Sequence, residues 1–340
     1  MIIPPKGGQN SAYGWLRHFF NYRRMSTYLV TGGAGFIGSH LSEELIRRGE
    51  QVRVVDSLIT GKRSNLAHLP TVEFMEGDLS VPGVAGAAVR GVDYVLHQAA
   101  IPSVPRSVDD PLTSNRANID ATLQVLVAAR DAGVKRVVYA ASSSAYGNTE
   151  TLPKHEDMPT NPLSPYALQK LVGEQYMQMF TALYKLETTS IRYFNVFGPR
   201  QDPSSPYSGV ISLFARALLD DKSPTIYGDG EQTRDFTYIA NVVDGVLRAV
   251  KAPGSSGAVV NVATGTRISL NHLFAVMRDL TGSRVNVSYA SSRDGDVKDS
   301  QADITRARTL LGYVPLVSFE EGLRRTIEWY RTESAAAPRA

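Results

Sequence analysis

The chain has no cysteine, and only six of its 340 residues are histidine. The absence of cysteine excludes disulfide bonds, thiolate chemistry and cysteine-ligated zinc, and the histidines show no metal-ligand spacing. No segment reaches the ~18 consecutive apolar residues that a membrane span needs. Neither sign of charge dominates, since 36 Lys and Arg accompany 33 Asp and Glu, so charge alone does not indicate nucleic-acid binding. We expect a soluble, cytoplasmic, enzyme-sized protein without metal, nucleic acid or membrane span.

The N-terminal extension, residues 1–25, differs in composition from the rest of the chain. Residues 1–10 are rich in proline and glycine, and residues 15–24 form a basic, aromatic run before Met25. The run lacks the apolar core and cleavage site of a secretion signal. Two interpretations stay open: a helix on a membrane surface, or an upstream extension or flap, with Met25 as an alternative start.

A glycine-rich turn follows the first apolar strand, residues 28–31, and precedes a helical pattern. In such a turn, Gly32 permits the tight bend, Gly35 lets backbone amides approach a pyrophosphate, and Gly38 lets the helix pack on the strand. The N-terminus of the helix favours negative charge. The turn therefore predicts a dinucleotide site.

The second strand, residues 51–55, ends in Asp56, about twenty residues beyond the turn, where an acid that grips a ribose diol is expected. An acid there repels a 2'-phosphate, which favours NAD over NADP. Lys62 and Arg63 follow closely enough to leave that preference open.

Strand and helix patterns continue to alternate, with further strands at residues 72–75, 93–97, 136–141 and 188–193. This alternation predicts an α/β fold: a Rossmann-type doubly wound parallel sheet with a smaller C-terminal α/β domain. Helical patterns at 240–251, 269–280 and 319–330 complete the smaller domain. We expect the larger domain mainly at 26–195, the smaller one mainly at 196–332 with the chain free to cross between them, and a disordered tail at 333–340.

Tyr166 and Lys170 lie one helical turn apart, on one face of a predicted helix. A tyrosine with a pKa near ~10 is a poor base at neutral pH, but a close cation can lower its pKa. The fifth strand ends in Ser142, Ser143 and Ser144 at the edge where open α/β sheets place their chemistry. These serines can hold a substrate oxygen and relay its proton. His97, at the end of the fourth strand, is interpreted as structural.

Taken together, these motifs resemble the extended short-chain dehydrogenase/reductases, and the segments 192–200, 227–236 and 293–296 resemble UDP-hexose 4-epimerases. Residues 103–111 and 200–203 are most similar to those of bacterial UDP-N-acetylglucosamine 4-epimerases. The resemblance covers residues 26–330. It implies an NAD-dependent isomerase that inverts C4 of a UDP-N-acetylhexosamine, and also UDP-glucose or UDP-galactose, through a 4-keto sugar.

The resemblance also implies roles for particular residues. Tyr166 and Lys170 would be catalytic, with Ser142 as the first choice to hold the substrate oxygen and Ser144 as the second. The other cofactor contacts would be Gly32, Gly35, Phe36, Ile37, Gly38, Asp56, Gly61, Asp78, Leu79, Gln98, Ala99, Ala100 and Asn118. The other substrate contacts would be Ser103, Ser143, Asn195, Val210, Tyr227, Arg234, Arg293, Asp296 and Ser300. Ser300 stands where epimerases of non-acetylated sugars resemble a tyrosine, so it would leave room for an N-acetyl group.

Three alternatives remain. A UDP-uronic acid 4-epimerase shares these motifs. A nucleotide-sugar dehydratase or decarboxylase would resemble Thr-Asp-Glu or Thr-Ser-Glu where this chain has three serines. A non-catalytic NAD-binding regulator could use the same fold. The resemblance further implies a homodimer that pairs helices at residues 111–132 and 166–185.

Overall fold

The computed structural model describes residues 25–203, 209–292 and 298–336. Its centre is a seven-stranded sheet in the order β11-β6-β5-β4-β1-β2-β3, with every pair parallel. The strands are β1 Thr27–Thr31, β2 Gln51–Asp56, β3 Glu73–Glu76, β4 Tyr94–His97, β5 Arg136–Ser142, β6 Glu187–Tyr193 and β11 Ala258–Val262. The strand order reverses between β1 and β4, which is where open sheets form their ligand crevice.

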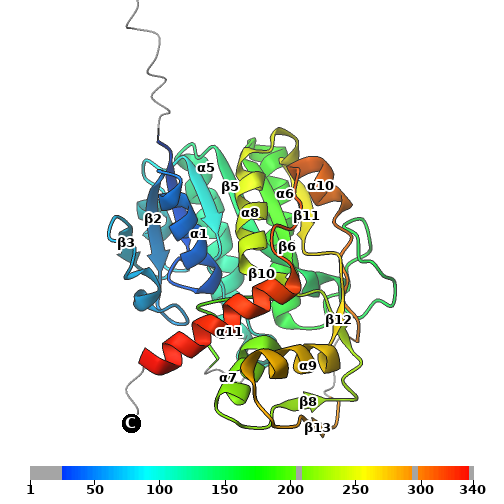
Figure 1. Ribbon diagram of the computed structural model, residues 1–340. Helices are drawn as coiled ribbons and strands as arrows, with labels where there is room; N and C mark the ends of the chain where they lie inside the picture. Colours follow the sequence, from blue (N-terminus) through cyan, green and yellow to red (C-terminus); the bar gives the residue numbers. More distant parts are fainter. Residues whose placement is uncertain (1–24, 204–208, 293–297, 337–340) are drawn as a thin grey trace, which may run out of the picture.

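Helices cover both faces of this sheet. Figure 1 shows α1 Phe36–Arg47 and α8 Ile239–Lys251 on the near face, with α5 Ala121–Asp131 and α6 Pro165–Tyr184 behind. Adjacent strand residues point to opposite faces, so Leu29 packs in the core with α5 and α6, whereas Val30 packs in the core with α1 and α8. The predicted fold class, a doubly wound parallel sheet, is confirmed.

The smaller domain contains α7 Val210–Leu219, α9 Leu270–Thr281 and short two-stranded sheets, which lie below the large sheet in Figure 1. Helix α11, Phe319–Ala336, packs against α7 and α9. The short pairs are β7 Val196–Phe197 with β10 Thr237–Tyr238, β8 Thr225–Tyr227 with β13 Ser288–Ala290, and β9 Thr233–Arg234 with β12 Ile268–Ser269. The remaining helices are α2 Val84–Ala88, α3 Val104–Asp109, α4 Pro111–Asn115 and α10 Thr305–Leu311; a π-helical segment, Arg116–Asp120, joins α4 to α5.

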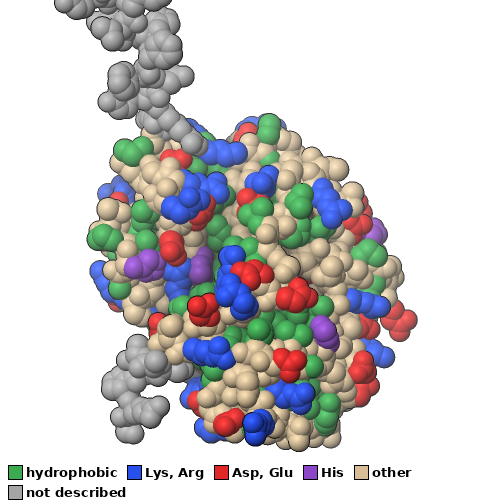
Figure 2. Space-filling model, viewed as in Figure 1, with side chains coloured by type: hydrophobic (Ala, Val, Ile, Leu, Met, Phe, Trp, Pro, Cys, Tyr) green, Lys and Arg blue, Asp and Glu red, His purple; other side chains and the backbone are tan. Residues whose placement is uncertain are grey.

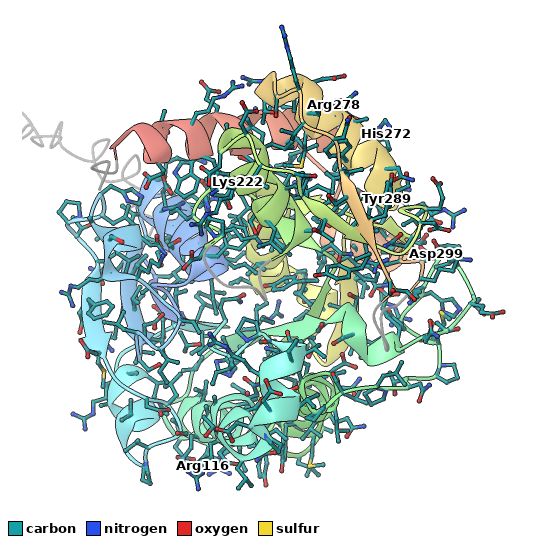
Figure 3. The ribbon with its side chains drawn as sticks, turned by 90° about the horizontal axis from the view of Figure 1, so that it is seen from below. Arg116, Lys222, His272, Arg278, Tyr289 and Asp299 are labelled. Atoms are coloured by element: carbon teal, nitrogen blue, oxygen red, sulfur yellow. The ribbon has the colours of Figure 1, made fainter. Side chains whose placement is uncertain are left out.

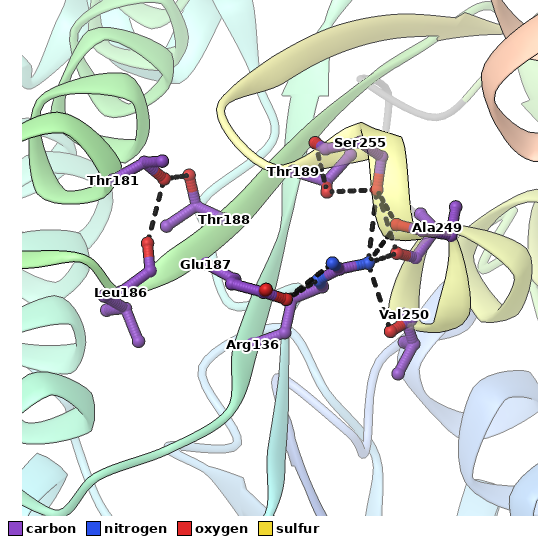
Figure 4. Close-up of polar contacts among 10 residues, drawn as sticks. Arg136, Thr181, Leu186, Glu187, Thr188, Thr189, Ala249, Val250 and Ser255 are labelled. Carbon is purple, nitrogen blue, oxygen red and sulfur yellow. Dashed lines mark hydrogen bonds and ion pairs between the residues drawn. The ribbon is translucent and has the colours of Figure 1, made fainter.

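Arg136, at the start of β5, ties the sheet to the end of α8 (Figure 4). Its buried guanidinium donates to the carbonyl oxygens of Ala249 and Ala252, each at 2.7 Å, and pairs with Glu187. The last carbonyls of a helix have no partner within the helix, so Arg136 supplies the donors that these buried groups need. The contact fixes α8 against the sheet.

Several features of the fold differ from the predictions made from the sequence, and one of those predictions concerns residues that the structure does not describe. The seventh strand, β11, was not expected, although its apolar run is typical of a buried parallel strand. Helix α11 continues to Ala336, into the segment predicted as a disordered tail; that part of the prediction is wrong, because the helical pattern extends past Tyr330. The N-terminal prediction concerns residues 1–24, which are outside the described residues. The helical pattern at 240–251 was predicted to belong to the smaller domain; that placement is wrong, because α8 buries its apolar face against the large sheet, beside α1. The domain boundaries stay a prediction.

Candidate active site

A cleft of about 1920 Å³ opens at the carboxyl ends of the strands and is lined by both domains. Pockets for a single small molecule typically enclose ~300 to 1,000 Å³. The cleft therefore has room for a dinucleotide and a second ligand. Its lining includes the glycine turn, which we call the cofactor arm or first arm, and Tyr227, Arg234 and Ser300, which we call the second arm.

The glycine turn forms the floor of the first arm. Gly32 has φ +64°, and a Cβ there would lie 2.8 Å from the backbone of Ala99, while a Cβ at Gly38 would overlap the carbonyl oxygen of Gly32. Gly35 is the N-cap of α1, and no side chain caps the first turn of this helix. Unsatisfied amides at a helix N-terminus bind phosphate oxygens well. The turn thus fits a dinucleotide pyrophosphate.

Asp56 ends β2 beside this turn, and its carboxylate accepts from the backbone amides of Ala34 at 2.9 Å and Leu58 at 2.8 Å. Burial raises its pKa, although these hydrogen bonds oppose the effect. The two nearby cations have other contacts: Lys62 pairs with Asp202 at 2.7 Å, and Arg63 stacks on a phenylalanine ring. Because both cations make these other contacts, neither is held in place to bind the 2'-phosphate of NADP, and this favours NAD as the cofactor.

The remaining predicted cofactor contacts line the same arm. They are Phe36, Ile37, Gly61, Asp78, Leu79, Gln98, Ala99 and Ala100. Asn118 does not line the cleft; it is buried, accepts from the backbone amide of Ile101 at 2.8 Å and donates to Gln169 at 2.8 Å. The structure therefore places Asn118 behind the wall that Ile101 forms, where it positions backbone.

Helix α6 begins at the cleft and carries Tyr166 and Lys170 in its first two turns. Ser164 caps the helix by accepting from the amide of Ala167, and the hydroxyl of Ser107 accepts from the amide of Tyr166 at 3.0 Å. The side chains of Tyr166 and Lys170 both line the cleft. Lys170 is buried, and its Nζ donates to the carbonyl oxygen of Ala140 at 2.8 Å.

The electrostatics of this pair differ from the expectation that Lys170 lowers the pKa of Tyr166. Burial raises the pKa of Tyr166 to about 12, and only a hydrogen bond with Ser142 opposes it. Burial lowers the pKa of Lys170 to about 7. The predicted lowering is thus wrong for the chain alone, because desolvation by burial is the main influence on the pKa of both groups and no attraction to Lys170 opposes it at Tyr166.

This lowered pKa predicts how stability depends on pH. Between about pH 7 and 9.5, unfolded Lys170 with its usual pKa of ~10.4 binds more protons than folded Lys170, so the free energy of unfolding should rise with pH in the wild type. Lys170→Met should remove this contribution. Urea unfolding of both proteins across this range measures it; equal slopes for the two would contradict the assignment.

The serines at the end of β5 lie close to Tyr166 in the cleft. Ser144 Oγ donates to Ser142 Oγ at 2.8 Å, and the Ser142 hydroxyl lowers the pKa of Tyr166 against the larger effect of burial. Ser143 lines the cleft beside them. Ser142 can therefore contact both Tyr166 and a substrate oxygen, which supports it as the first choice.

His97 is structural, as interpreted. It is completely buried and contacts the hydroxyls of Thr31 at 2.7 Å and Thr122 at 3.0 Å through its two ring nitrogens. Burial lowers its pKa to about 3. A permanently neutral, fully bonded imidazole links β4 to its neighbours and does not titrate near neutral pH.

The second arm brings together predicted substrate contacts from several distant segments: Ser103, Asn195, Val210, Tyr227, Arg234 and Ser300. Asn195 follows β6, Tyr227 ends β8 and Arg234 ends β9, so all three sit at element ends. The guanidinium of Arg234 donates to the carbonyl oxygens of Thr233 and Lys298. Arg293 and Asp296 lie outside the described residues.

Two basic residues of the cleft were missed by sequence reasoning. Arg200 lines the cleft and joins the smaller domain to α1, where it contacts His40 and Glu43. Lys154 is buried in the wall near Gly147. Arg200 belongs to the segments 192–200 and 200–203, but these gave it no role, and no motif includes Lys154; only the fold shows that both residues line the cleft.

Other kinds of site find no support in the described part of the chain. No group of three or more potential ligands there could hold a metal ion, and no helix there is long and apolar enough to cross a membrane. On the face in Figure 2, basic and acidic side chains are interspersed.

The sequence and fold were compared with known proteins. Residues 28–263 match the model of the NAD dependent epimerase/dehydratase family. A UDP-glucose 4-epimerase of Mycolicibacterium smegmatis is 39% identical over 311 residues, which cover 90% of this chain and 99% of that protein.

Two solved structures are also similar. A UDP-N-acetylglucosamine 4-epimerase from Methanobrevibacter ruminantium, in complex with UDP-N-acetylmuramic acid, has a TM-score of 0.87 at 39% identity, covering 91% of this chain and 99% of that one. A UDP-glucuronic acid 4-epimerase from Bacillus cereus, with UDP-glucuronic acid and NAD, has a TM-score of 0.84 at 32% identity, covering 90% and 99%.

Proposed function

The chain belongs to the NAD dependent epimerase/dehydratase family, and we propose that it inverts C4 of UDP-N-acetylhexosamines, interconverting UDP-GlcNAc and UDP-GalNAc. UDP-glucose and UDP-galactose would be further substrates. One observation carries the proposal: a single cleft is lined by the glycine turn, by Ser142 and Tyr166, and by the small side chain of Ser300. The coarser activity, that of a UDP-sugar 4-epimerase, agrees with all three relatives described above. NAD as the cofactor agrees with the family and with the Bacillus cereus structure.

The chemistry follows from the placement of these groups. NAD, when bound, supplies the hydride acceptor and donor, so no net redox occurs. Tyr166 takes the proton of the C4 hydroxyl as hydride leaves C4, and returns it after the 4-keto sugar has turned its other face to the cofactor. Ser142, held by Ser144, keeps the C4 oxygen beside the phenol. Lys170, when protonated, stabilises the phenolate.

The alternatives differ in what they need from the cleft. A uronic acid 4-epimerase would use the same catalytic groups, as the Bacillus cereus relative illustrates. A dehydratase or decarboxylase would need an acidic residue at one of positions 142–144, and this chain has serine at all three. A non-catalytic NAD-binding regulator would not need Tyr166 and Lys170 in the cleft. Incubation with a panel of UDP-sugars, with the products resolved by chromatography, tests all of these.

Cofactor binding is expected to depend on Asp56. Asp56→Ala removes an acceptor for the ribose hydroxyls and should weaken NAD binding about tenfold to a hundredfold, since a hydrogen bond to a charged group contributes ~1.5–3 kcal/mol. NAD should co-purify with the wild type, and released cofactor can be assayed directly. Asp279→Ala, on α9 outside the cleft, is the control. NADP in place of NAD, or unchanged affinity in Asp56→Ala, would contradict the assignment.

The homodimer remains a proposal, now with a surface to support it. Large apolar side chains are exposed on α4 and α6, which lie within the two segments predicted to pair, residues 111–132 and 166–185: Leu112, Leu168, Met179, Leu183 and Tyr184. Exposed apolar surface often marks an interface. Sedimentation at micromolar concentration should show a dimer, and Leu112→Glu with Leu183→Glu should shift it to monomer. A wild type that is only monomeric would refute this.

A further inference from the structure

Lys154 is a buried cation in the cleft that the mechanism above does not use. It lies between η3, the short helix Ser143–Tyr146, and α6, and its side chain is only 2% exposed. It nevertheless lines the same cleft as Ser144, Arg234 and Ser300. A buried lysine is rare unless something pairs with it.

The backbone of Lys154 is fixed against the segment that carries Ser300. Its amide donates to the carbonyl oxygen of Gln301 at 2.8 Å, and its own carbonyl oxygen accepts from the amide of Asp303 at 2.9 Å. The side chain contacts the segment that follows the serines, where Nζ donates to the carbonyl oxygen of Gly147 at 3.3 Å. Lys154 therefore joins the segment after the serines to the segment that carries Ser300, and Gly147, Lys154 and Ser300 all line the cleft.

The hydrogen bonds of this ammonium group are incomplete. An ammonium has three donors, and the contact with Gly147 is long. Within the described residues Lys154 forms no ion pair; Asp299, placed with Tyr289 on the smaller-domain side in Figure 3, favours the charge electrostatically, while burial and Arg234 lower the pKa of Lys154. A desolvated cation that lacks a counter-ion is costly, so a ligand that supplies an acceptor oxygen gains from it.

We propose that Lys154 is a specificity residue that donates to an acyl oxygen on the sugar ring, either the carbonyl of an acetamido group or a carboxylate. Both oxygens accept more strongly than the hydroxyl that replaces them in a plain hexose, and a hydrogen bond with one charged partner is about twice as strong as a neutral one. This inference rests on the proposed function, because it assumes a UDP-sugar in the second arm. The proposal gives a reason why Lys154 and the small side chain of Ser300 line the same cleft.

The test compares the affinities of wild type and Lys154→Met for UDP-glucose, UDP-GlcNAc and UDP-glucuronic acid by calorimetry. Methionine has a similar length and packs well in irregular gaps, so the thermal midpoint should not fall. Affinity for at least one acyl-bearing sugar should drop about tenfold to a hundredfold, while affinity for UDP-glucose stays within about threefold. The sugar that loses affinity identifies the source of the oxygen. Lys222→Met, an exposed lysine labelled in Figure 3, is the matched control.

An equal loss for all three sugars would overturn the proposal, since Lys154 would then only support the turn at Gly147. Unchanged affinities would overturn it as well. Affinity does not require turnover, so these outcomes are distinct from failure of the proposed function, which wild-type turnover of the same sugars measures separately.

Discussion

Replacement of Tyr166 by phenylalanine is expected to lower kcat for UDP-GlcNAc epimerisation by about 10² to 10⁴, the usual contribution of a general acid and base. The phenol lines the cleft together with Ser142, whose hydroxyl lowers the pKa of Tyr166, so Tyr166 is our candidate to take the proton. Phenylalanine keeps the ring and therefore its packing. Affinity for UDP-sugar should stay close to that of the wild type, because the other substrate contacts are unchanged.

Single-turnover kinetics and calorimetry separate the two effects of Tyr166→Phe. Tyr289→Phe is the matched control: Tyr289 is exposed on β13, its hydroxyl contacts Asn271 outside the cleft, and its loss should leave kcat unchanged. If Tyr166→Phe keeps near-normal turnover, the proton goes elsewhere, and Ser142 and Ser144 become the candidates.

Introduction of tyrosine at position 300 is expected to change substrate selectivity. Ser300 is buried in the cleft wall, and its amide is fixed by the carbonyl oxygen of Thr233 at 3.1 Å, so a larger side chain must extend into the cleft. Overfilling a packed site costs ~1 to 3 kcal/mol. Ser300→Tyr should therefore lower kcat/KM for the N-acetylated pair about tenfold to a hundredfold, and spare UDP-glucose and UDP-galactose.

The matched control is Ser300→Ala, which removes the hydroxyl group without enlarging the side chain and should keep the wild-type selectivity. Both substrate pairs are assayed in all three proteins. An equal loss on both pairs in Ser300→Tyr would show a general defect, and a wild type without activity on the N-acetylated pair would remove the argument for a pocket.

Local patterns predicted most of the fold and the cofactor arm. The glycine turn and Asp56 could be identified because a strand, a turn and a helix in immediate succession have specific backbone needs. Tyr166 and Lys170 could be paired because residues four apart share a helix face. β11 was missed, since its partner β6 lies about seventy residues earlier in the chain and no local signal specifies that pairing.

The rest of the site depends on long-range packing. Lys154 and Arg200 are ordinary loop residues in the sequence, and only tertiary structure brings them to the cleft. Burial likewise decides the pKa values of Tyr166 and Lys170, and spacing alone could not give the degree of desolvation. Asn118 was predicted to contact the cofactor, but its position in the sequence could not show that its side-chain amide hydrogen-bonds Ile101 and Gln169 instead.

The central claim, that hydride leaves C4 and returns to the opposite face of the same carbon, is tested most directly with an isotope. UDP-GlcNAc carrying deuterium at C4 is incubated with the enzyme in ordinary water, and the product is examined by NMR and mass spectrometry. The account predicts UDP-GalNAc that retains the deuterium at C4, because bound NAD would supply both the hydride acceptor and the hydride donor, without exchange of this hydrogen with solvent. Loss of deuterium to water, or a product that is not inverted at C4, would contradict it.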